Sequence, residues 1–170
     1  VFAALRGAGG PAWLVEEPVH DALGAGLKPH YRRLRFVVER VDAATEAALD
    51  EALPGVERAH EAKGWRGRFE GTDLSVTPLR RRLPPHVPLS ERGLSPLARD
   101  LATREVSVRA VAMDGAGGVF DPFGGLDDHR SGLIRLVVAP TRLPPESAGW
   151  IPRVAVHSAL WDLPVDPELE

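Results

Sequence analysis

Two pairs of charged residues near the N-terminus have a spacing that could support binding chemistry. Arg33 and Arg35 alternate at the start of an apolar run, and alternate residues of a strand point to the same face of a sheet. Two guanidinium groups on one face could bind an anion without a metal ion. They could instead form ion pairs with Glu16 and Glu17 and close the site. We favour ion pairing, because charges held at close range without a ligand must be neutralised.

Other polar residues give weaker signals. Arg80, Arg81 and Arg82 could bind phosphate, although a run of arginines in a loop is more often a solvated or partner-facing patch. Asp127 and Asp128 are adjacent in an expected helix and point about 100° apart, which favours a solvated first turn over a catalytic pair. The histidines lack a metal-binding spacing such as HExxH, and we expect four of them to be surface or packing residues: His20, His30, His129 and His157.

The composition is that of one domain of ordinary size. The chain has 170 residues, of which 44% are hydrophobic, so it can bury a core. No stretch approaches the ~20 consecutive apolar residues of a membrane helix. The absence of cysteine excludes disulfides and thiolate metal sites, and it is consistent with a cytoplasmic location. A net charge of −3 gives no global basic field, so charge does not support RNA as a partner.

Apolar periodicity, glycines and prolines predict the elements that position these residues. Alternating or short apolar runs predict strands at residues 12–15, 34–39, 64–70, 72–77, 106–112, 119–122 and 133–138. Gly71 is expected to join two of these strands as a hairpin. Helices are predicted at residues 18–23, 43–53, 96–102 and 126–131, with one or two helical turns at 56–62 and a weakly helical segment at 150–161.

The segment from Asp121 to Arg135, DPFGGLDDHRSGLIR, resembles the DPFGGLEDLEAGVIR motif of one enzyme family. That family comprises the bacterial tRNA nucleotidyltransferases (CCA-adding enzymes) and the related bacterial poly(A) polymerases. The resemblance implies an α+β fold, the polymerase-beta-like nucleotidyltransferase head, with a mixed, mostly antiparallel sheet of about five strands and helices mainly on one side. Residues 1–148 would form the head domain, and residues 149–170 a truncated neck-like segment.

The resemblance is much weaker at the positions that carry the family's chemistry. The family binds two Mg²⁺ ions through an Asp-x-Asp pair and a third carboxylate, and these positions correspond to Arg33, Arg35 and Ser75 here. Two glycines of the family's triphosphate-binding turn correspond to Glu16 and Glu17, which would repel a triphosphate. We therefore expect no catalytic residue, no bound metal and no other cofactor in this chain.

The resemblance and the arginine content together define two sets of candidate residues. The matching motif is expected to be a scaffold whose turn and helix pack on the sheet, with the members Asp121, Pro122, Gly124, Gly125, Asp128 and Arg135. Thr103, Arg104 and Glu105 stand where the family has Arg-Arg-Asp, and Arg109 stands where it has Asn. The candidates for binding a nucleotide or another anion are Arg33, Arg35, Arg80, Arg104, Arg109 and Arg153.

The scaffold motif matches the family well and the metal-binding positions do not, and this contrast leads to three hypotheses for the function. The leading one is a catalytically degenerate head-like domain that serves as a binding or assembly module. A divergent active tRNA nucleotidyltransferase, performing CCA or partial CCA addition, would need Mg²⁺ and carboxylates from elsewhere, such as Glu39, Asp42 or Asp73. The third is metal-free binding of a nucleotide or an RNA backbone by Arg33, Arg35 and the Arg80 loop.

The C-terminal segment suggests a further partner. Residues from Trp150 to Trp161 include six large apolar side chains, which are difficult for a short terminal segment to bury. Exposed apolar patches often mark interfaces, and tryptophan is enriched among interface anchors. We therefore expect self-association or a protein partner through this segment. The alternative is that both tryptophans pack on the chain's own core.

Overall fold

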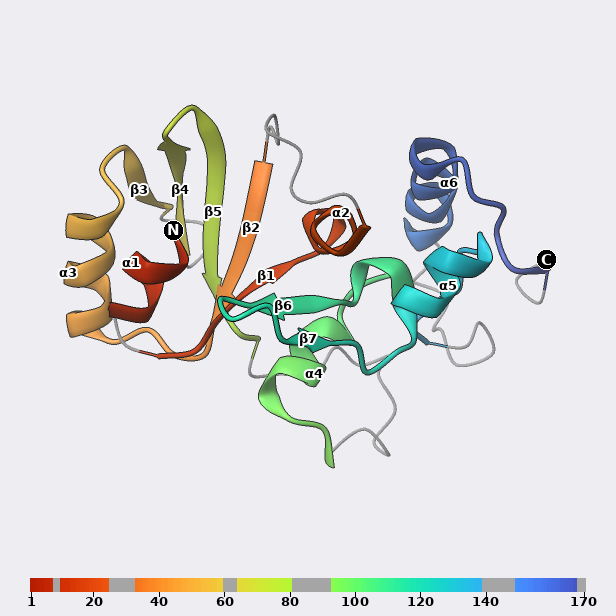
Figure 1. The fold of residues 1–170 in the computed structure, drawn as a ribbon, viewed down its shortest axis with the longest axis horizontal. Helices are drawn as coiled ribbons and strands as arrows, with labels where there is room; N and C mark the ends of the chain where they lie inside the picture. The colour runs from red at the N-terminus through yellow and green to blue at the C-terminus, as the bar shows by residue number, and fades with distance from the viewer. Residues whose placement is uncertain (8–9, 25–32, 60–63, 81–92, 139–148, 168–170) are drawn as a thin grey trace. The chain divides into compact units, whose positions relative to one another are not determined.

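The computed structural model describes residues 1–7, 10–24, 33–59, 64–80, 93–138 and 149–167 (Figure 1). The chain divides into two compact units, and each unit contains two segments of the sequence. The first unit comprises residues 1–79 and 112–120, and the second comprises residues 80–111 and 121–170. These divisions differ from the boundary expected between residues 148 and 149, and that domain division stays a prediction.

A mixed β-sheet forms the centre of the first unit. Among the described residues it has seven strands in the order β3-β4-β5-β2-β1-β6-β7. β2 and β5 are parallel, and all other neighbouring strands are antiparallel. The strands are β1 (Ala12–Val15), β2 (Arg33–Val38), β3 (Val56–Ala59), β4 (Gly64–Phe69), β5 (Thr72–Pro78), β6 (Ala112–Asp114) and β7 (Val119–Phe120). The predicted α+β fold with a mostly antiparallel sheet is confirmed, with seven strands rather than about five.

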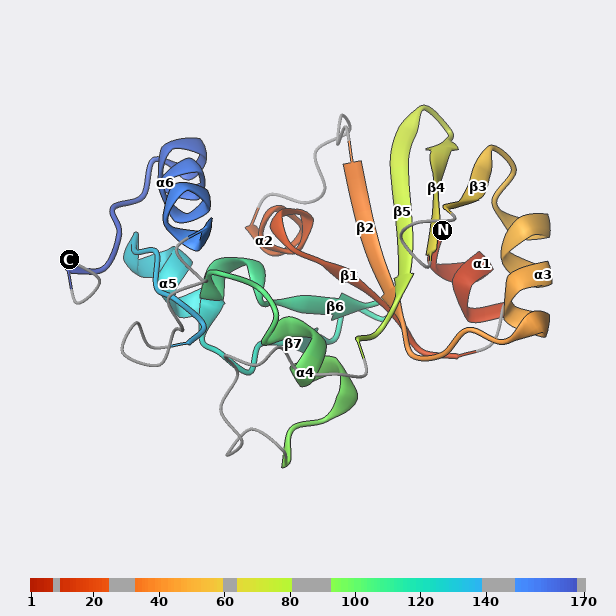
Figure 2. The ribbon, with the colours of Figure 1, turned by 180° about the vertical axis from the view of Figure 1, so that it is seen from behind.

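One face of this sheet carries the core of the first unit. Phe36, Val76 and Trp65 stand opposite one another on β2, β5 and β4, so they share a face. The ring of Phe36 contacts Phe2 edge-on at 5.1 Å, and the indole Nε1 of Trp65 donates to Asp50 at 3.0 Å. These partners belong to two helices that lie side by side (Figure 2). The helices of this unit are α1 (Phe2–Gly7), α2 (Glu17–Gly24) and α3 (Ala43–Ala52).

The second unit is built from short helices around a small apolar cluster. Its elements are α4 (Pro96–Leu101), the 3₁₀ turn η2 (Ser107–Arg109), α5 (Gly125–Ser131) and α6 (Trp150–Trp161). Four buried side chains form the cluster, with partly buried residues around them: Val106, Val108, Ile134 and Val154, against Leu136, Trp161, Leu163 and Val165. The helices predicted at 96–102, 126–131 and 150–161 are therefore confirmed. No helix in the described part of the chain is long and apolar enough to cross a membrane.

The predicted strand at residues 106–112 is wrong. This segment instead forms η2, and only Ala112 enters a strand. Alternation predicts a strand when one face is buried and the other is exposed. Here Val106, Ser107 and Val108 are each at most 1% exposed, because the backbone N–H of Ser107 donates to Arg135 and both sides of the segment are covered. Apolar alternation in a fully buried segment carries no information about faces.

Two further element predictions are wrong for a related reason. Residues 133–138 make only single bridges, Val106 with Leu136 and Ile134 with Val165, instead of a strand. Residues 56–59 form β3, not helical turns, because they pair with β4 of the predicted hairpin. Both outcomes depend on partners distant in the sequence. His30, Arg81, Arg82 and Ala139–Ala148 lie outside the described residues.

The DPFGGLDD motif forms the entry to α5. The carboxylate of Asp121 accepts hydrogen bonds from the backbone N–H groups of Gly125 and Leu126, at 2.8 and 2.9 Å. These are N–H groups of the first helical turn, which have no partner within the helix. Gly124 precedes the helix with φ of 71°, a left-handed conformation that favours glycine. The order Asp-Pro-Phe-Gly-Gly thus supplies a cap and a turn to one helix.

Charged residues later in the motif connect α5 to its surroundings in the second unit. The buried carboxylate of Asp128 accepts from the Ser107 hydroxyl and pairs with Arg135 at 3.0 Å. Arg135 also pairs with Asp166 at 3.1 Å. These contacts are what a scaffold role requires, and that role for the motif stays a prediction.

Gly125 provides a direct test of this scaffold role. A Cβ at this position would overlap the backbone carbonyl of Ser107, and backbone atoms cannot move aside as side chains do. We expect Gly125→Ala to cost roughly 1–3 kcal/mol of unfolding free energy, by overpacking. Gly149→Ala is the matched control, since its Cβ would meet no atom within 4 Å and its φ is −62°. Thermal unfolding of both variants would measure the effect, and equal melting temperatures would contradict the scaffold role.

Candidate functional site

The face of the sheet opposite α1 and α3 carries a row of polar residues. Arg35 on β2 is paired in register with Ser75 on β5, and Ser75 is paired with Arg66 on β4. Two residues earlier on each of these two strands, Arg33 on β2 is paired with Asp73 on β5. Directly paired residues of neighbouring strands point to the same face, so these side chains gather above one patch of sheet.

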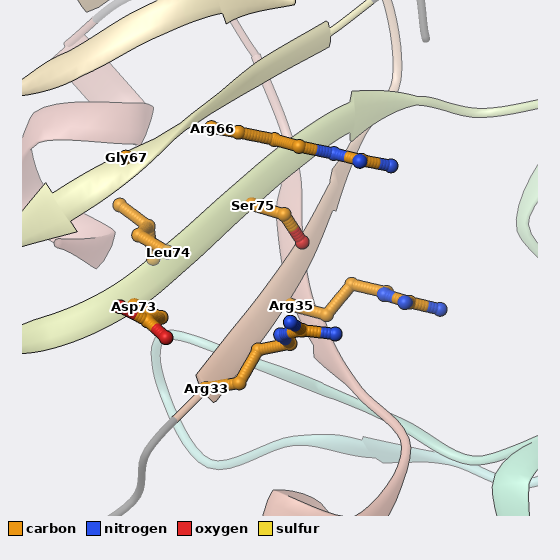
Figure 3. Close-up of a pocket in the computed structure, with 7 residues that line it drawn as sticks. All are labelled: Arg33, Arg35, Arg66, Gly67, Asp73, Leu74 and Ser75. Atoms are coloured by element: carbon orange, nitrogen blue, oxygen red, sulfur yellow. The ribbon is translucent and has the colours of Figure 1, made fainter.

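These side chains surround a cavity of about 220 Å³. Figure 3 shows the side chains of Arg33, Arg35 and Arg66 extending to the side of the sheet on which the Ser75 hydroxyl lies. We call this site the arginine pocket and define it by its lining residues: Arg33, Arg35, Arg66, Gly67, Asp73, Leu74 and Ser75. All of them belong to the first unit.

A short ion pair closes one side of the site. Arg35 donates to Glu16 at 2.6 Å, and the Glu16 side chain is only 5% exposed. The predicted pairing is therefore confirmed for these two residues. Of Glu17 the structure describes only the backbone, in α2. Arg33 has no ion pair with any described residue, so the expectation that both arginines are neutralised is not met within the described residues.

Glu16 has an unusual backbone conformation. Its φ is 72°, in the left-handed region that glycine adopts without steric cost. The residue joins β1 to α2, and its carbonyl accepts from the backbone N–H of Val19 at 3.0 Å. The position corresponds to a glycine in the family that the sequence resembles. The backbone of a glycine turn is thus present here with a glutamate side chain on it.

Ser75 contributes a polar group without a partner. Its hydroxyl oxygen is buried, and no described residue makes a hydrogen bond with it. Buried polar groups are nearly always hydrogen-bonded, because an unpaired one has lost its water contacts without compensation. A buried, unpartnered hydroxyl at the floor of an arginine-lined cavity is therefore a feature that calls for explanation.

The carboxylates that the structure describes form no cluster that could hold a metal ion. Within the described residues, no group of three or more His, Cys, Asp or Glu side chains is placed to do so. Of the alternative ligands, Asp42 accepts from Thr45 as the cap of α3, and Glu39 is exposed after β2. Asp73 lines the arginine pocket but lies 3.7 Å from Arg68.

The remaining anion-binding candidates lie in the second unit, mostly in internal ion pairs. Arg104 pairs with Asp100 at 2.9 Å, and both side chains are buried. Arg153 pairs with Glu105 at 2.6 Å, and Arg109 lies 3.7 Å from the same carboxylate. Arg109 also lies 3.0 Å from the Nε2 atom of His157. Arg80 is exposed, and its backbone N–H donates to Asp100. The structure therefore does not group the six candidates into one site within either unit.

The other sequence candidates have ordinary surroundings. The ring of His129 packs edge-on against Trp161 at 5.9 Å, and His20 is buried. Asp127 forms an exposed pair with Arg130 at 2.8 Å, as expected for a solvated first turn. Arg66 was missed by the sequence analysis. The predicted hairpin around Gly71 would have revealed it, because counting back from that turn places Arg66 opposite Ser75.

Known proteins with similar sequences are CCA-adding enzymes. A multifunctional CCA protein of Nitrosomonas eutropha is 38% identical over 72 residues, which is 42% of this chain and 17% of that protein. A CCA-adding enzyme of Bacillus licheniformis is 32% identical over 107 residues, or 59% of this chain and 27% of the enzyme. The chain thus matches about a quarter or less of these relatives. No protein-family model matches it.

Solved structures with the same fold come from the same group of enzymes. The CCA-adding enzyme of Bacillus stearothermophilus in complex with CTP has a TM-score of 0.72 and 22% identity, covering 99% of this chain and 40% of that one. A tRNA nucleotidyltransferase complexed with a primer tRNA and an ATP analog has a TM-score of 0.69 and 22% identity, covering 94% and 44%. The fold is therefore that of a nucleotidyltransferase head. With the sequence relatives, it confirms the resemblance to the tRNA nucleotidyltransferase family.

The Glu105 pair in the second unit gives a pH-dependent prediction. Burial raises the pKa of Glu105, but the hydrogen bond from Arg153 and the charges of Arg153 and Arg109 outweigh it, so the pKa lies below the ordinary 4.5. A carboxylate with a lowered folded-state pKa stabilises the fold above its unfolded-state pKa. This stabilisation is lost as the pH falls through the folded-state value.

We expect Glu105→Gln to lower the unfolding free energy at pH 7 by about 1–2 kcal/mol, and this difference should shrink below pH 4.5. Urea unfolding of both proteins between pH 7 and pH 3 would measure it. Glu46→Gln, which removes an exposed pair with Arg58 at 2.8 Å, should have little effect at any pH. A Glu105→Gln difference that stays constant to pH 3 would contradict the proposed ionisation.

Proposed function

We propose that this chain is a catalytically degenerate nucleotidyltransferase-like head domain that acts as a binding or assembly module. One observation carries the proposal: Arg33, Arg35 and Ser75 lie on one face of β2 and β5, and the sequence resemblance matches these positions to the family's three metal-binding carboxylates. Mg²⁺ requires hard oxygen ligands, and two-metal phosphoryl transfer needs both ions between enzyme and substrate. Guanidinium groups have no lone pair to offer a metal and stay charged at any relevant pH.

The surroundings of these residues support the same proposal. Glu16 occupies the turn at which the family's glycines approach a triphosphate, and its carboxylate adds negative charge there. Arg35 is committed to this carboxylate. Some structural neighbours are complexes with a nucleotide or with tRNA, which makes RNA a plausible partner for this chain. In the proposed role, the domain would bind a partner such as RNA but would not transfer nucleotides.

We expect the purified chain to transfer no nucleotide. The assay would incubate the protein with Mg²⁺, labelled CTP or ATP, and tRNA lacking its 3′ end, with a CCA-adding enzyme as the positive control. Incorporation should equal that of a sample without protein, because Arg33, Arg35 and Ser75 offer no carboxylate to hold Mg²⁺ at the reacting phosphate. Incorporation above this background that a chelator abolishes would refute the proposal that the domain is catalytically degenerate, and it would favour a divergent active enzyme.

The assembly role rests on helix α6 in the second unit. Val156 and Leu160 are four residues apart and so lie on one side of the helix, where they are exposed at 53% and 71%. Trp161, by contrast, packs against the unit's own apolar cluster, and Val154 is buried within it. The exposed face of α6, rather than its tryptophans, is therefore the surface through which we propose self-association. A helix face of this kind becomes favourable when a second copy removes it from water.

The double variant Val156→Gln/Leu160→Gln should sediment as a monomer at concentrations where the unchanged chain self-associates. Val119→Gln is a suitable control, since Val119 is also exposed but lies on β7 of the first unit. Sedimentation equilibrium over a range of concentrations would compare the three proteins. A monomeric unchanged chain, or a double variant that associates equally well, would contradict the assembly role of α6.

A further inference from the structure

We propose that the arginine pocket binds a phosphate dianion directly, without a bridging metal ion. The inference rests on the proposed function, since it assumes that no Mg²⁺ occupies this face of the sheet. It goes further by naming the chemical class of the ligand and the residues that bind it. The binding residues are Arg33 and Arg66 at the rim, Ser75 at the floor and Arg35 at the side.

The charges of the pocket favour an anion. Three guanidinium groups line it against one carboxylate, that of Asp73, which also lies 3.7 Å from Arg68 outside the pocket. Glu16 neutralises Arg35, so positive charge remains in excess. Arg33 and Arg66 have no ion pair with any described residue. Arg33 on β2 and Arg66 on β4 stand on either side of β5, so an anion above Ser75 would be attracted by both.

The hydroxyl of Ser75 supplies a donor at the floor of the same pocket. It is buried, has no hydrogen-bond partner among the described residues, and points between Arg35 and Arg66 (Figure 3). A phosphate oxygen would accept its hydrogen bond, while the two arginine side chains, both partly or largely exposed, shift to admit the ligand. The unpartnered hydroxyl and the excess cations thus point to one kind of ligand.

The size of the cavity selects a compact phosphate group. Its volume of about 220 Å³ is below the roughly 300–1,000 Å³ typical of pockets for drug-sized molecules. Arginine suits such a ligand because its planar fork binds two phosphate oxygens at once. Free phosphate and the terminal phosphate of a nucleotide share this chemistry, so the test includes both.

The experiment is an NMR titration of the full chain with inorganic phosphate, in a chelator to remove divalent metals. Backbone resonances of β2, β4 and β5 should shift saturably at roughly millimolar ligand. Arg66→Gln should weaken this binding at least tenfold, the loss expected for one charge-assisted hydrogen bond. Arg58→Gln should leave it unchanged, because Arg58 on β3 lies outside the pocket and pairs with Glu46 on the other face of the sheet. Ser75→Ala should also weaken binding while keeping the shape of the floor.

A parallel titration with ATP separates the two sources of phosphate. The proposal is supported if inorganic phosphate binds and if the affinity for ATP is at most tenfold higher than the affinity for phosphate. No response to phosphate, equal loss in Arg66→Gln and Arg58→Gln, or tight binding of ATP alone would overturn it. Binding that requires Mg²⁺ would overturn both this inference and the degenerate reading. Absence of binding together with absence of nucleotide incorporation would overturn this inference only.

Discussion

The ion pair between Glu16 and Arg35 is the contact on which the character of the site depends. Glu16 holds a left-handed backbone conformation that costs a non-glycine residue about 1 kcal/mol or more. Its carboxylate is almost fully buried, and a buried charge is tolerated only when it is paired. Replacing Arg35 alone would therefore remove a short ion pair from a buried carboxylate. The pair ties the turn between β1 and α2 to the centre of the sheet.

The two faces of the sheet explain how charged side chains can occupy this site without loss of the fold. The opposite face of the same strands holds Phe36, Val76 and Trp65, and the contacts of Phe36 with Phe2 and of Trp65 with Asp50 involve none of the residues of the arginine pocket. Because neighbouring residues of a strand point to opposite faces, one face can change its chemistry while the other keeps the core. The polar face needs only that its charges be balanced, and Glu16 and Asp73 supply part of that balance.

Local chemistry explains which features could be predicted from the sequence. Gly71 and the flanking alternation predict the β4–β5 hairpin, and the DPFGG motif predicts a capped helix at α5, because both depend on residues close in the chain. The predicted strand at 106–112 is wrong because both sides of that segment are buried by residues far along the chain, such as Ile134 and Val154. Arg66 went unnoticed for a related reason, since its role follows from strand register and not from a motif.

The arginines of the two units show why composition could not identify a binding site. In the second unit Arg104 is buried with Asp100, and Arg153 holds the carboxylate of Glu105, so these cations stabilise the fold. In the first unit Arg33 and Arg66 face a cavity without an ion pair to any described residue. All four residues are the same in type and carry the same charge. An arginine is a candidate for ligand binding where the nearby carboxylates are too few to pair with all nearby arginines. The net charge of −3 is a property of the whole chain and does not reveal such a local excess of positive charge.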